Sequence, residues 1–424
     1  MAAIFNGGLS AFFLGQFLSI FSGLFGLSVL SWHIVSRFGA AGIAEFMGAM
    51  ALITLLSHLL LSPIGDRYDK LKVLKRFSWL VALRGLLLVY VVGLQDASLY
   101  WLVALQLVNG IAMAAIVPSR ASLVVDMLPP DRVAAAYGLQ SSVESAARVL
   151  GPAMAGLALV TFSVPSCLWV HAVLMLLACV LNMFLKLRPE AAAAERARQG
   201  QTRKSWLRDI ADIWRARLMI PMERTLGLMG LVVACAYLPA MTMLIPLKVH
   251  HQGWSTVYLG MAEGMLAAGT LIAGLGPGAW VVKRVGRYRM LMCAGMAQGV
   301  ALVVAGLASM PLLFALAYFL VGFFGMAGGL AMASYRMLAT PRHFRARLGS
   351  AGMSLTMLAG FIGSYLCGIA LQSFSVNGVQ VLLGSVVLLG GLGYLLVPRL
   401  KEFMGLPAKE VELWYEREYR DAFK

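Results

Sequence analysis

Residues 42–76 of this 424-residue chain read GIAEFMGAMALITLLSHLLLSPIGDRYDKLKVLKR, an apolar run that leads directly into a polar gap rich in Lys and Arg. The alternation recurs along the chain, and 24 of the 35 Lys and Arg residues fall in five such gaps. The basic gaps are 67–76, 120–132, 186–217, 283–289 and 336–347, and the gaps between them hold at most Arg37 and Lys248. Because cytoplasmic loops of membrane proteins accumulate Lys and Arg, the pattern predicts a polytopic membrane protein with both termini in the cytoplasm.

The composition supports the same prediction. Hydrophobic residues make up 60% of the chain and charged residues only 13%, with a mean hydropathy of +0.81. Long apolar runs without period-two alternation favour membrane helices of about 20 residues over a barrel. We therefore predict an all-α membrane protein with twelve transmembrane helices, near 8–34, 42–62, 72–95, 98–119, 134–161, 163–186, 222–247, 256–281, 289–308, 310–335, 347–372 and 376–397.

The positive charge of the chain has a topological explanation. A formal net charge of +16 would indicate a nucleic-acid partner in a soluble protein. Here the basic residues face the cytosol and its anionic lipid headgroups, so we expect membrane lipids and no nucleic acid as partners. The 5 cysteines are scattered singly, without a disulfide framework or zinc spacing. We expect no metal site and no cofactor.

The longest interior polar segment divides the predicted helices into two groups of six. We expect an N-terminal six-helix bundle at 1–186, a cytoplasmic linker at 187–217, a C-terminal six-helix bundle at 218–398 and a cytoplasmic tail at 399–424. Within the linker, 206–214 is either a short amphipathic helix or part of a flexible connection. The acidic and aromatic end of the tail fits either an amphipathic surface helix or a docking site for a cytosolic partner.

The two groups of helices repeat some polar features. A basic gap closes the second predicted helix and another closes the eighth, and Arg120 and Arg336 recur at nearly the same offset. Such weak internal symmetry is typical of transporters whose parallel halves rock about a central site near the bilayer midplane.

The gap at 62–72, SPIGDRYDKLK, resembles the loop between helices 2 and 3 of the major facilitator superfamily. Within that superfamily the chain is most similar to the enterobactin-exporter and multidrug proton-antiporter branch, which implies twelve helices in two pseudo-symmetric six-helix bundles. The residues that match the loop are Asp66, Arg67 and Lys70. The resemblance implies that they form a conformational latch that holds one state and releases in the other. The alternative is a basic loop that only sets topology.

The fifth predicted helix carries a second part of the resemblance. Exporters of the family place small residues and a Gly-Pro pair along this helix, and the matching positions here are Gly138, Ala147, Gly151, Pro152, Ala155 and Gly156. Small residues let neighbouring helices approach closely, and Pro152 removes a backbone donor. The match favours efflux as the direction of transport. Generic small-residue packing is the alternative interpretation.

The fourth predicted helix departs from the drug-antiporter pattern. Gln106 stands where that pattern has a buried arginine thought to serve proton transfer, while Asn109 and Gly110 fit it. Proton coupling therefore has to involve other residues.

Ionisable residues at membrane depth are costly, so each is a functional candidate. Glu144 lies close to the bilayer midplane, and Arg148 follows one turn later on the same face, which allows an i, i+4 pair. Two interpretations are open: Glu144 takes up and releases a proton, or the two residues form a fixed strut. Glu263 in the eighth predicted helix is a further proton-coupling candidate.

The resemblance also implies which helices line a central cavity, namely the first, fourth, seventh and tenth. Their polar and aromatic candidates for the cavity are Gln16, Gln106, Asn109, Tyr237, Tyr318 and Phe324. A mostly neutral set with aromatic residues suits an amphipathic or aromatic small molecule.

Together these patterns predict a monomeric secondary transporter in the bacterial inner membrane. We expect proton-coupled efflux of a siderophore or drug-like compound by alternating access, with protons as the coupling ion. An importer or lysophospholipid flippase on the same fold is the first alternative, and a non-transporting signalling or scaffold protein is the second. No nucleophile, base and oxyanion arrangement is recognisable, so we do not expect an enzyme.

Overall fold

The computed structural model describes residues 7–61, 69–94, 97–127, 130–185, 215, 217–341, 345–419 and 422, and these ranges are mostly helical with no strand among them. The helices of the first half are α1 (Gly7–Leu61), α3 (Lys70–Gly93), α4 (Leu99–Met127), α5 (Pro130–Thr161) and α6 (Val164–Met183). They are followed by α9 (Pro221–Thr242), α10 (Leu244–His251), α11 (Thr256–Gly274), α12 (Pro277–Val285), α13 (Arg287–Leu307), α14 (Pro311–Ala339), α15 (Arg345–Ser373) and α16 (Val376–Gly393). The chain ends with η3 (Tyr394–Leu396), α17 (Leu400–Gly405), α18 (Ala408–Val411) and α19 (Trp414–Glu418).

Within the described residues, 11 helices are long and apolar enough to cross a membrane. One of these spans, Ser10–Leu60 in α1, contains two helices that join at a kink. The kink lies at Gly39, whose φ of 64° is in the left-handed region that favours glycine. The first two predicted helices are therefore counted as one element, and the prediction of an all-α membrane fold is confirmed.

The chain forms two compact units. The first unit comprises Met1–Thr202 and Gln252–Gly264, and the second comprises Arg203–His251 and Met265–Lys424. The N-terminal part of α11, up to Gly264, thus belongs to the first unit although it follows α9 and α10 in the sequence.

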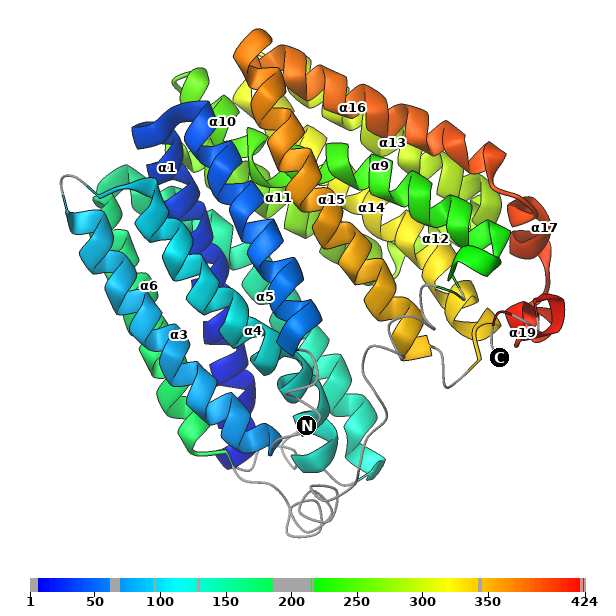
Figure 1. The fold of residues 1–424 in the computed structure, drawn as a ribbon, viewed down its shortest axis with the longest axis horizontal. Helices are drawn as coiled ribbons and strands as arrows, with labels where there is room; N and C mark the ends of the chain where they lie inside the picture. The colour runs from blue at the N-terminus through cyan, green and yellow to red at the C-terminus, as the bar shows by residue number, and fades with distance from the viewer. Residues whose placement is uncertain are drawn as a thin grey trace. The chain divides into compact units, whose positions relative to one another are not determined.

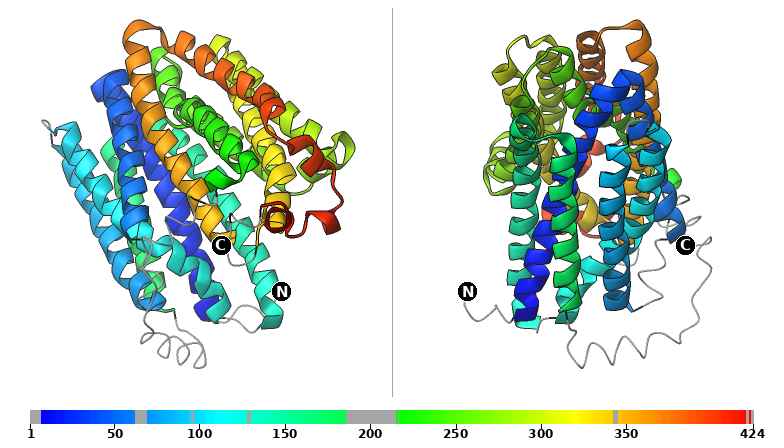
Figure 2. Two further views of the ribbon diagram at one scale, coloured as in Figure 1. Left: turned by 45° about the vertical axis from the view of Figure 1, so that its right-hand side comes forward. Right: turned by 90° about the vertical axis from the view of Figure 1, so that its left-hand side faces the viewer.

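In the first unit the long helices pack side by side (Figure 1). Helix α1 packs against α4, α5 and α6, and α3 packs against α4 and α6 (Figure 2). Helix α3 begins where Asp69 accepts hydrogen bonds from the Leu71 and Lys72 amides, at 3.0 Å and 3.1 Å, which satisfies two free donors of the first turn. The apolar core between the helices includes Phe12, Leu74 and Leu123.

In the second unit α13 packs against α14 and α16, and α9 packs against α15 and α16. Two predicted helices are interrupted there. The predicted helix at 256–281 ends at Gly274 and resumes at Pro277, because Gly276 has a φ of 142° and Pro277 is suited to a first helical position. The predicted helix at 222–247 likewise divides between α9 and α10 at Met243.

Lys248 lies outside the five basic gaps, and the structure gives it a local role. Its ammonium group is fully buried and donates to the carbonyls of Ala305 and Gly306 at 2.6 Å and 2.7 Å, at the C-terminal end of α13. These carbonyls have no partner within their own helix, so the cation stabilises the helix end. Burial lowers the pKa of Lys248 to about 8.

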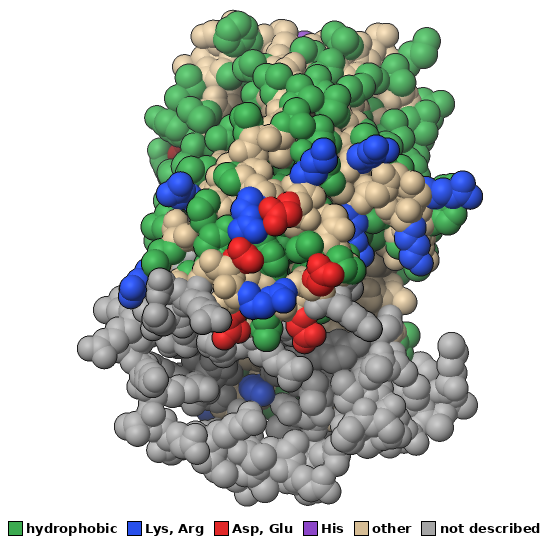
Figure 3. Space-filling model, turned by 90° about the vertical axis from the view of Figure 1, so that its right-hand side faces the viewer, with side chains coloured by type: hydrophobic (Ala, Val, Ile, Leu, Met, Phe, Trp, Pro, Cys, Tyr) green, Lys and Arg blue, Asp and Glu red, His purple; other side chains and the backbone are tan. Residues whose placement is uncertain are grey.

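The C-terminal segment is part of the second unit. Helix α17 packs against α13, and α18 and α19 pack against α14. Trp414 and Tyr415 are 4% and 0% exposed and belong to one apolar cluster with Phe403 and Ile220. Phe403, Trp414 and Tyr415 are therefore core residues, and Tyr419 packs against them half-buried. One face of the molecule shows a broad apolar area and, next to it, a band where charged side chains gather (Figure 3).

Candidate functional site

A cavity of about 410 Å³ lies among the helices of the first unit, and we call it the first-unit cavity. Its walls come from α1, α3, α4, α5 and α6. Polar side chains on these walls include Gln16, Arg84, Gln106, Asn109, Glu144 and Arg148. Most other lining residues are apolar or glycine, so the cavity suits an amphipathic organic molecule.

Glu144 of α5 is held by two amide groups. Gln16 Nε2 donates to its carboxylate at 2.6 Å and Gln140 Nε2 donates at 3.1 Å. Among the described residues no ion pair joins Glu144 to Arg148, whose side chain is exposed. Arg120 lines the same cavity, and no ion pair joins it to Glu144 among the described residues. The expected i, i+4 contact is thus absent from this conformation, while both residues line the same cavity.

Arg84 of α3 enters the same cavity. Its side chain is only 7% exposed, and one terminal nitrogen donates to Gln106 Oε1 at 3.3 Å. The Nε atom has no hydrogen-bond partner in the described part of the chain. A guanidinium group therefore lies beside Gln106, the position where the resembling antiporters carry an arginine of their own.

His171 of α6 also lines the cavity. Its Nδ1 lies 2.8 Å from the Ser22 carbonyl, which can only accept, so Nδ1 carries the proton and donates. The Ser22 hydroxyl in turn donates to the His171 carbonyl at 2.9 Å. His171 Nε2 is buried and meets no partner in the described ranges.

Glu263 lies outside the first-unit cavity but inside the same unit. Its carboxylate accepts a hydrogen bond from the Ser28 hydroxyl of α1. No cation is paired with it among the ion pairs of the described residues. Its predicted role in proton coupling stays a prediction.

The small residues of α5 lie where other helices come close. A Cβ atom added at Gly156 would lie 2.6 Å from Gly260 Cα of α11, and one added at Gly151 would lie 2.9 Å from the Phe21 carbonyl of α1. Both distances are shorter than a real Cβ contact. Ala147 and Ala155 are fully buried, and Gly138 and Pro152 also lie in α5. The spacing of small residues thus corresponds to close backbone contacts within the first unit.

The predicted latch is only partly described. Asp66 and Arg67 lie outside the described residues, and Lys70 is the first residue of α3. The switching role of these three residues stays a prediction.

The cavity candidates of the second unit lie in different surroundings. Tyr318 is fully buried, and its hydroxyl donates to the Ala240 carbonyl at 2.7 Å. Phe324 packs beside an apolar cluster with Val282 and Met290. A Cβ atom at Gly325, which lines a second cavity of about 380 Å³, would lie 3.7 Å from the Tyr237 hydroxyl. Tyr318 and Phe324 thus serve helix packing in this conformation.

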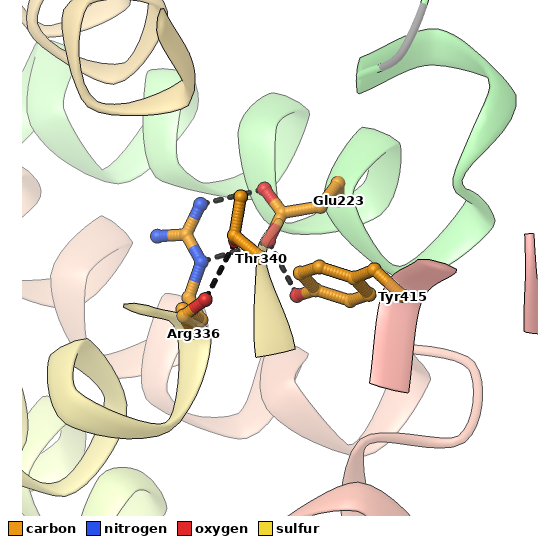
Figure 4. Close-up of polar contacts among 4 residues, drawn as sticks. All are labelled: Glu223, Arg336, Thr340 and Tyr415. Carbon is orange, nitrogen blue, oxygen red and sulfur yellow. Dashed lines mark hydrogen bonds and ion pairs between the residues drawn. The ribbon is translucent and has the colours of Figure 1, made fainter. Parts of the chain in front are cut away.

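The second unit also contains a polar cluster that the sequence did not indicate (Figure 4). Arg336 Nε and a terminal nitrogen donate to the two carboxylate oxygens of Glu223 at 2.8 Å and 2.6 Å. The Tyr415 hydroxyl donates to the same carboxylate at 2.6 Å. Burial, together with the neighbouring Glu223 charge, raises the pKa of Tyr415 well above its usual value, so the phenol stays protonated. Thr340 donates to the Arg336 carbonyl at 2.7 Å.

Several residues of the first-unit cavity were not selected from the sequence. In the sequence, Arg84 is an ionisable residue within the predicted helix at 72–95, and Gln140 precedes Glu144 by one helical turn, so both could have been found. His171 gave no signal beyond a lone histidine in an apolar helix, which usually bonds a neighbour.

Long apolar helices around a cavity with polar side chains on its walls are typical of a membrane transporter. The family model of the Major Facilitator Superfamily matches residues 12–276. This is more than half of the chain, and the protein belongs to that superfamily. It is therefore a multi-pass membrane transporter and not an enzyme.

Relatives agree with this assignment. The chain is 25% identical over 405 residues to the multidrug efflux pump Tap of Mycobacterium tuberculosis, covering 91% of this chain and 93% of that one. It is 23% identical over 373 residues to the uncharacterized MFS-type transporter YfiS of Bacillus subtilis, covering 84% and 85%. The crystal structure of the nucleoside transporter NupG superposes with a TM-score of 0.74 at 12% identity, covering 92% of this chain and 99% of that one. That likeness concerns the fold.

Proposed function

We propose that this protein is a proton-coupled exporter of organic small molecules that works by alternating access as a monomer. In this proposal it lies in the bacterial inner membrane with both termini in the cytoplasm, and its substrates are siderophores or drug-like compounds. The observation that carries the proposal is the Glu144 carboxylate in the wall of the first-unit cavity, held by amides and not by a cation.

Amide partners suit a carboxyl group that changes its protonation state. A cation stabilises only the charged carboxylate, whereas an amide can donate to the carboxylate or accept from the protonated acid. The Oε1 atoms of Gln16 and Gln140 are both buried and have no partner among the described residues. Each amide therefore has an acceptor to offer a protonated Glu144. The same two side chains can accommodate both states.

Two observations support export as the direction. A relative that matches 91% of this chain is named a multidrug efflux pump. The small residues of α5 that resemble the exporter pattern lie at close backbone contacts, at Gly151 and Gly156. The scaffold alternative is less favoured, because the aromatic residues Trp414 and Tyr415 are buried in the second unit and do not form a docking surface.

Transport in inverted membrane vesicles tests the proposal. An inside-acidic gradient should drive uptake of at least one compound from a panel of siderophores and organic dyes, and substrate addition should release protons from the lumen. Glu144→Gln should lose gradient-driven uptake but keep substrate counterflow without a gradient, because a permanently neutral side chain removes coupling and not binding. Glu45→Gln is the matched control, since Glu45 is an exposed carboxylate in α1.

The alternatives predict other results. Gradient-driven uptake only in right-side-out vesicles indicates an importer or a flippase. Unchanged uptake in Glu144→Gln removes that residue from the coupling mechanism. Absence of flux for every compound in both orientations contradicts the transport proposal.

A further inference from the structure

We infer that the first-unit cavity selects organic anions and that Arg84 binds the anionic group. The inference rests on the proposed function for its biological meaning, because a binding site in a transporter is a substrate site. Its physical basis is independent of transport and comes from the charge balance and the unpartnered groups of the cavity.

The walls of the cavity carry more positive than negative charge. Among the lining residues of the described chain, Arg84, Arg120 and Arg148 face a single carboxylate, Glu144. That carboxylate already accepts two hydrogen bonds from amides. Because charges interact strongly where water is scarce, an organic cation would be repelled and an organic anion attracted.

Arg84 is the arginine best placed to hold the anion. Its side chain is more than nine-tenths buried, and its hydrogen bond to Gln106 Oε1 connects it to a neutral group only. Nε has no partner, and no ion pair to Arg84 occurs among the described residues. A buried guanidinium without a counter-charge is costly. A ligand carboxylate, sulfonate or phenolate would supply the missing charge and acceptor.

His171 provides a hydrogen-bond acceptor near Arg84. A Cβ atom at Gly85, the residue after Arg84, would lie 3.8 Å from His171 Nε2, and the Arg84 charge acts on the imidazole. Because Nδ1 donates to Ser22, the neutral ring presents Nε2 as an acceptor, and this atom is buried without a partner. The site therefore favours an anion with a hydroxyl or N–H donor near its charged group.

The rest of the wall fits the apolar body of such a molecule. Leu24, Leu88, Met113 and Met175 line the cavity beside the polar groups. Their apolar surface adds affinity that does not depend on the sign of the ligand charge. Charge selectivity should therefore come from the arginines, and general affinity from the wall.

Two dyes with the same xanthene ring system and opposite charge test the inference. Binding of fluorescein, an anion, and rhodamine 123, a cation, is measured by fluorescence anisotropy on the purified full-length protein, with protein-free micelles subtracted. The variants are Arg84→Gln, which removes the charge, and Arg84→Lys, which keeps it but loses the planar guanidinium. Arg284→Gln is the control, because Arg284 is exposed and lies over the Trp280 ring at 5.2 Å.

The wild-type protein should bind fluorescein more tightly than rhodamine 123. Arg84→Gln should weaken fluorescein binding about tenfold or more, as expected for a lost hydrogen bond to a charged group. Rhodamine 123 should bind this variant as well as before or better, Arg84→Lys should be intermediate for fluorescein, and Arg284→Gln should match the wild type.

Two binding results would overturn the inference. One is equal or tighter binding of rhodamine 123 by the wild type, which needs no variant to be folded. The other is an equal loss of both dyes in Arg84→Gln, with the folded state checked by size exclusion. Because binding is measured without a gradient, charge-selective binding without flux would refute only the transport proposal. Flux of rhodamine 123 alone would refute only the anion site.

Discussion

Two arginines in this protein are held in opposite ways. In the second unit Arg336 makes two hydrogen bonds to the fully buried Glu223, and Tyr415 donates a third to the same carboxylate. In the first unit Arg84 meets one amide oxygen, and its Nε atom has no partner among the described residues. A saturated pair stabilises one arrangement of helices, whereas an unsaturated charge in a cavity is available to a ligand. The number of hydrogen-bond partners therefore distinguishes the structural charge of Arg336 from the ligand-binding charge that we infer for Arg84.

The two arrangements also predict opposite effects of mutation. Removing one partner of a buried pair leaves the other charge uncompensated and strongly destabilises a protein. Removing a buried charge that has no partner also removes its desolvation penalty. Stability and binding measurements on the two sets of residues can therefore test whether paired and unpaired arginines differ in this way.

Glu223→Gln should have the largest effect. The substitution keeps the size of the side chain but leaves Arg336 without a counter-charge, and such losses cost about 3–5 kcal/mol. We expect a large drop in the thermal unfolding midpoint of the purified protein, measured by scanning fluorimetry in detergent. Glu45→Gln, at an exposed position, is the matched control and should unfold like the wild type.

The double variant Glu223→Gln/Arg336→Gln tests whether the loss of stability comes from the unpaired arginine. With both charges removed, the pair of amides no longer contains an unpaired ion, so part of the lost stability should return. A double variant as unstable as the sum of its single variants would show that the two side chains act independently. The distinction between paired and unpaired arginines would then fail.

Tyr415→Phe should have the next largest effect. The phenylalanine keeps the stacked contact with Phe403, whose ring centroid lies 5.9 Å away, and removes only the hydrogen bond to Glu223. Hydrogen bonds to charged groups contribute about 1.5–3 kcal/mol. We expect a lower unfolding midpoint with the fold retained. An unchanged midpoint would show that Arg336 alone satisfies the Glu223 carboxylate.

Much of the fold could be predicted from the sequence, because the length of an apolar run depends only on bilayer thickness. What the runs could not show is where the backbone breaks. Hydropathy passes smoothly over Gly276 and Pro277, yet the positive φ at Gly276 ends the helix. At Gly39 the sequence predicts two separate helices, whereas the structure joins them across a sharp kink.

The candidate site was harder to predict because one sequence does not fix the rotation of a helix. Depth alone pointed to Glu144, and the structure puts it on the cavity wall beside Gln16 and Gln140. Tyr318 lies on an equally plausible helix but turns into the packed interior. The pairing of Glu223 with Tyr415 joins residues 192 positions apart, and no local pattern indicates it.

Arg399→Gln should lower the unfolding midpoint less than Glu223→Gln and less than Tyr415→Phe. Arg399 pairs with Glu402 and Glu418 at 2.9 Å and 2.8 Å, but its side chain is 39% exposed and theirs are 53% and 39% exposed. Exposed pairs contribute at most about 1 kcal/mol and are screened by salt. The expected small loss of stability should shrink further when the unfolding is measured at high salt. A loss as large as that of Glu223→Gln, at any salt concentration, would contradict the contrast between buried and exposed pairs.

Arg84→Gln should have the smallest effect on stability. The hydrogen bond to Gln106 is lost, but so is the penalty for burying an unpaired charge, and the two changes offset each other. The unfolding midpoint without ligand should therefore stay close to that of the wild type. Fluorescein should raise the midpoint of the wild type but not that of the variant, because only a ligand that binds the folded state stabilises it. A loss of stability comparable to that of Glu223→Gln would mean that Arg84 stabilises the first unit. Arg84 and Arg336 would then both have a structural role.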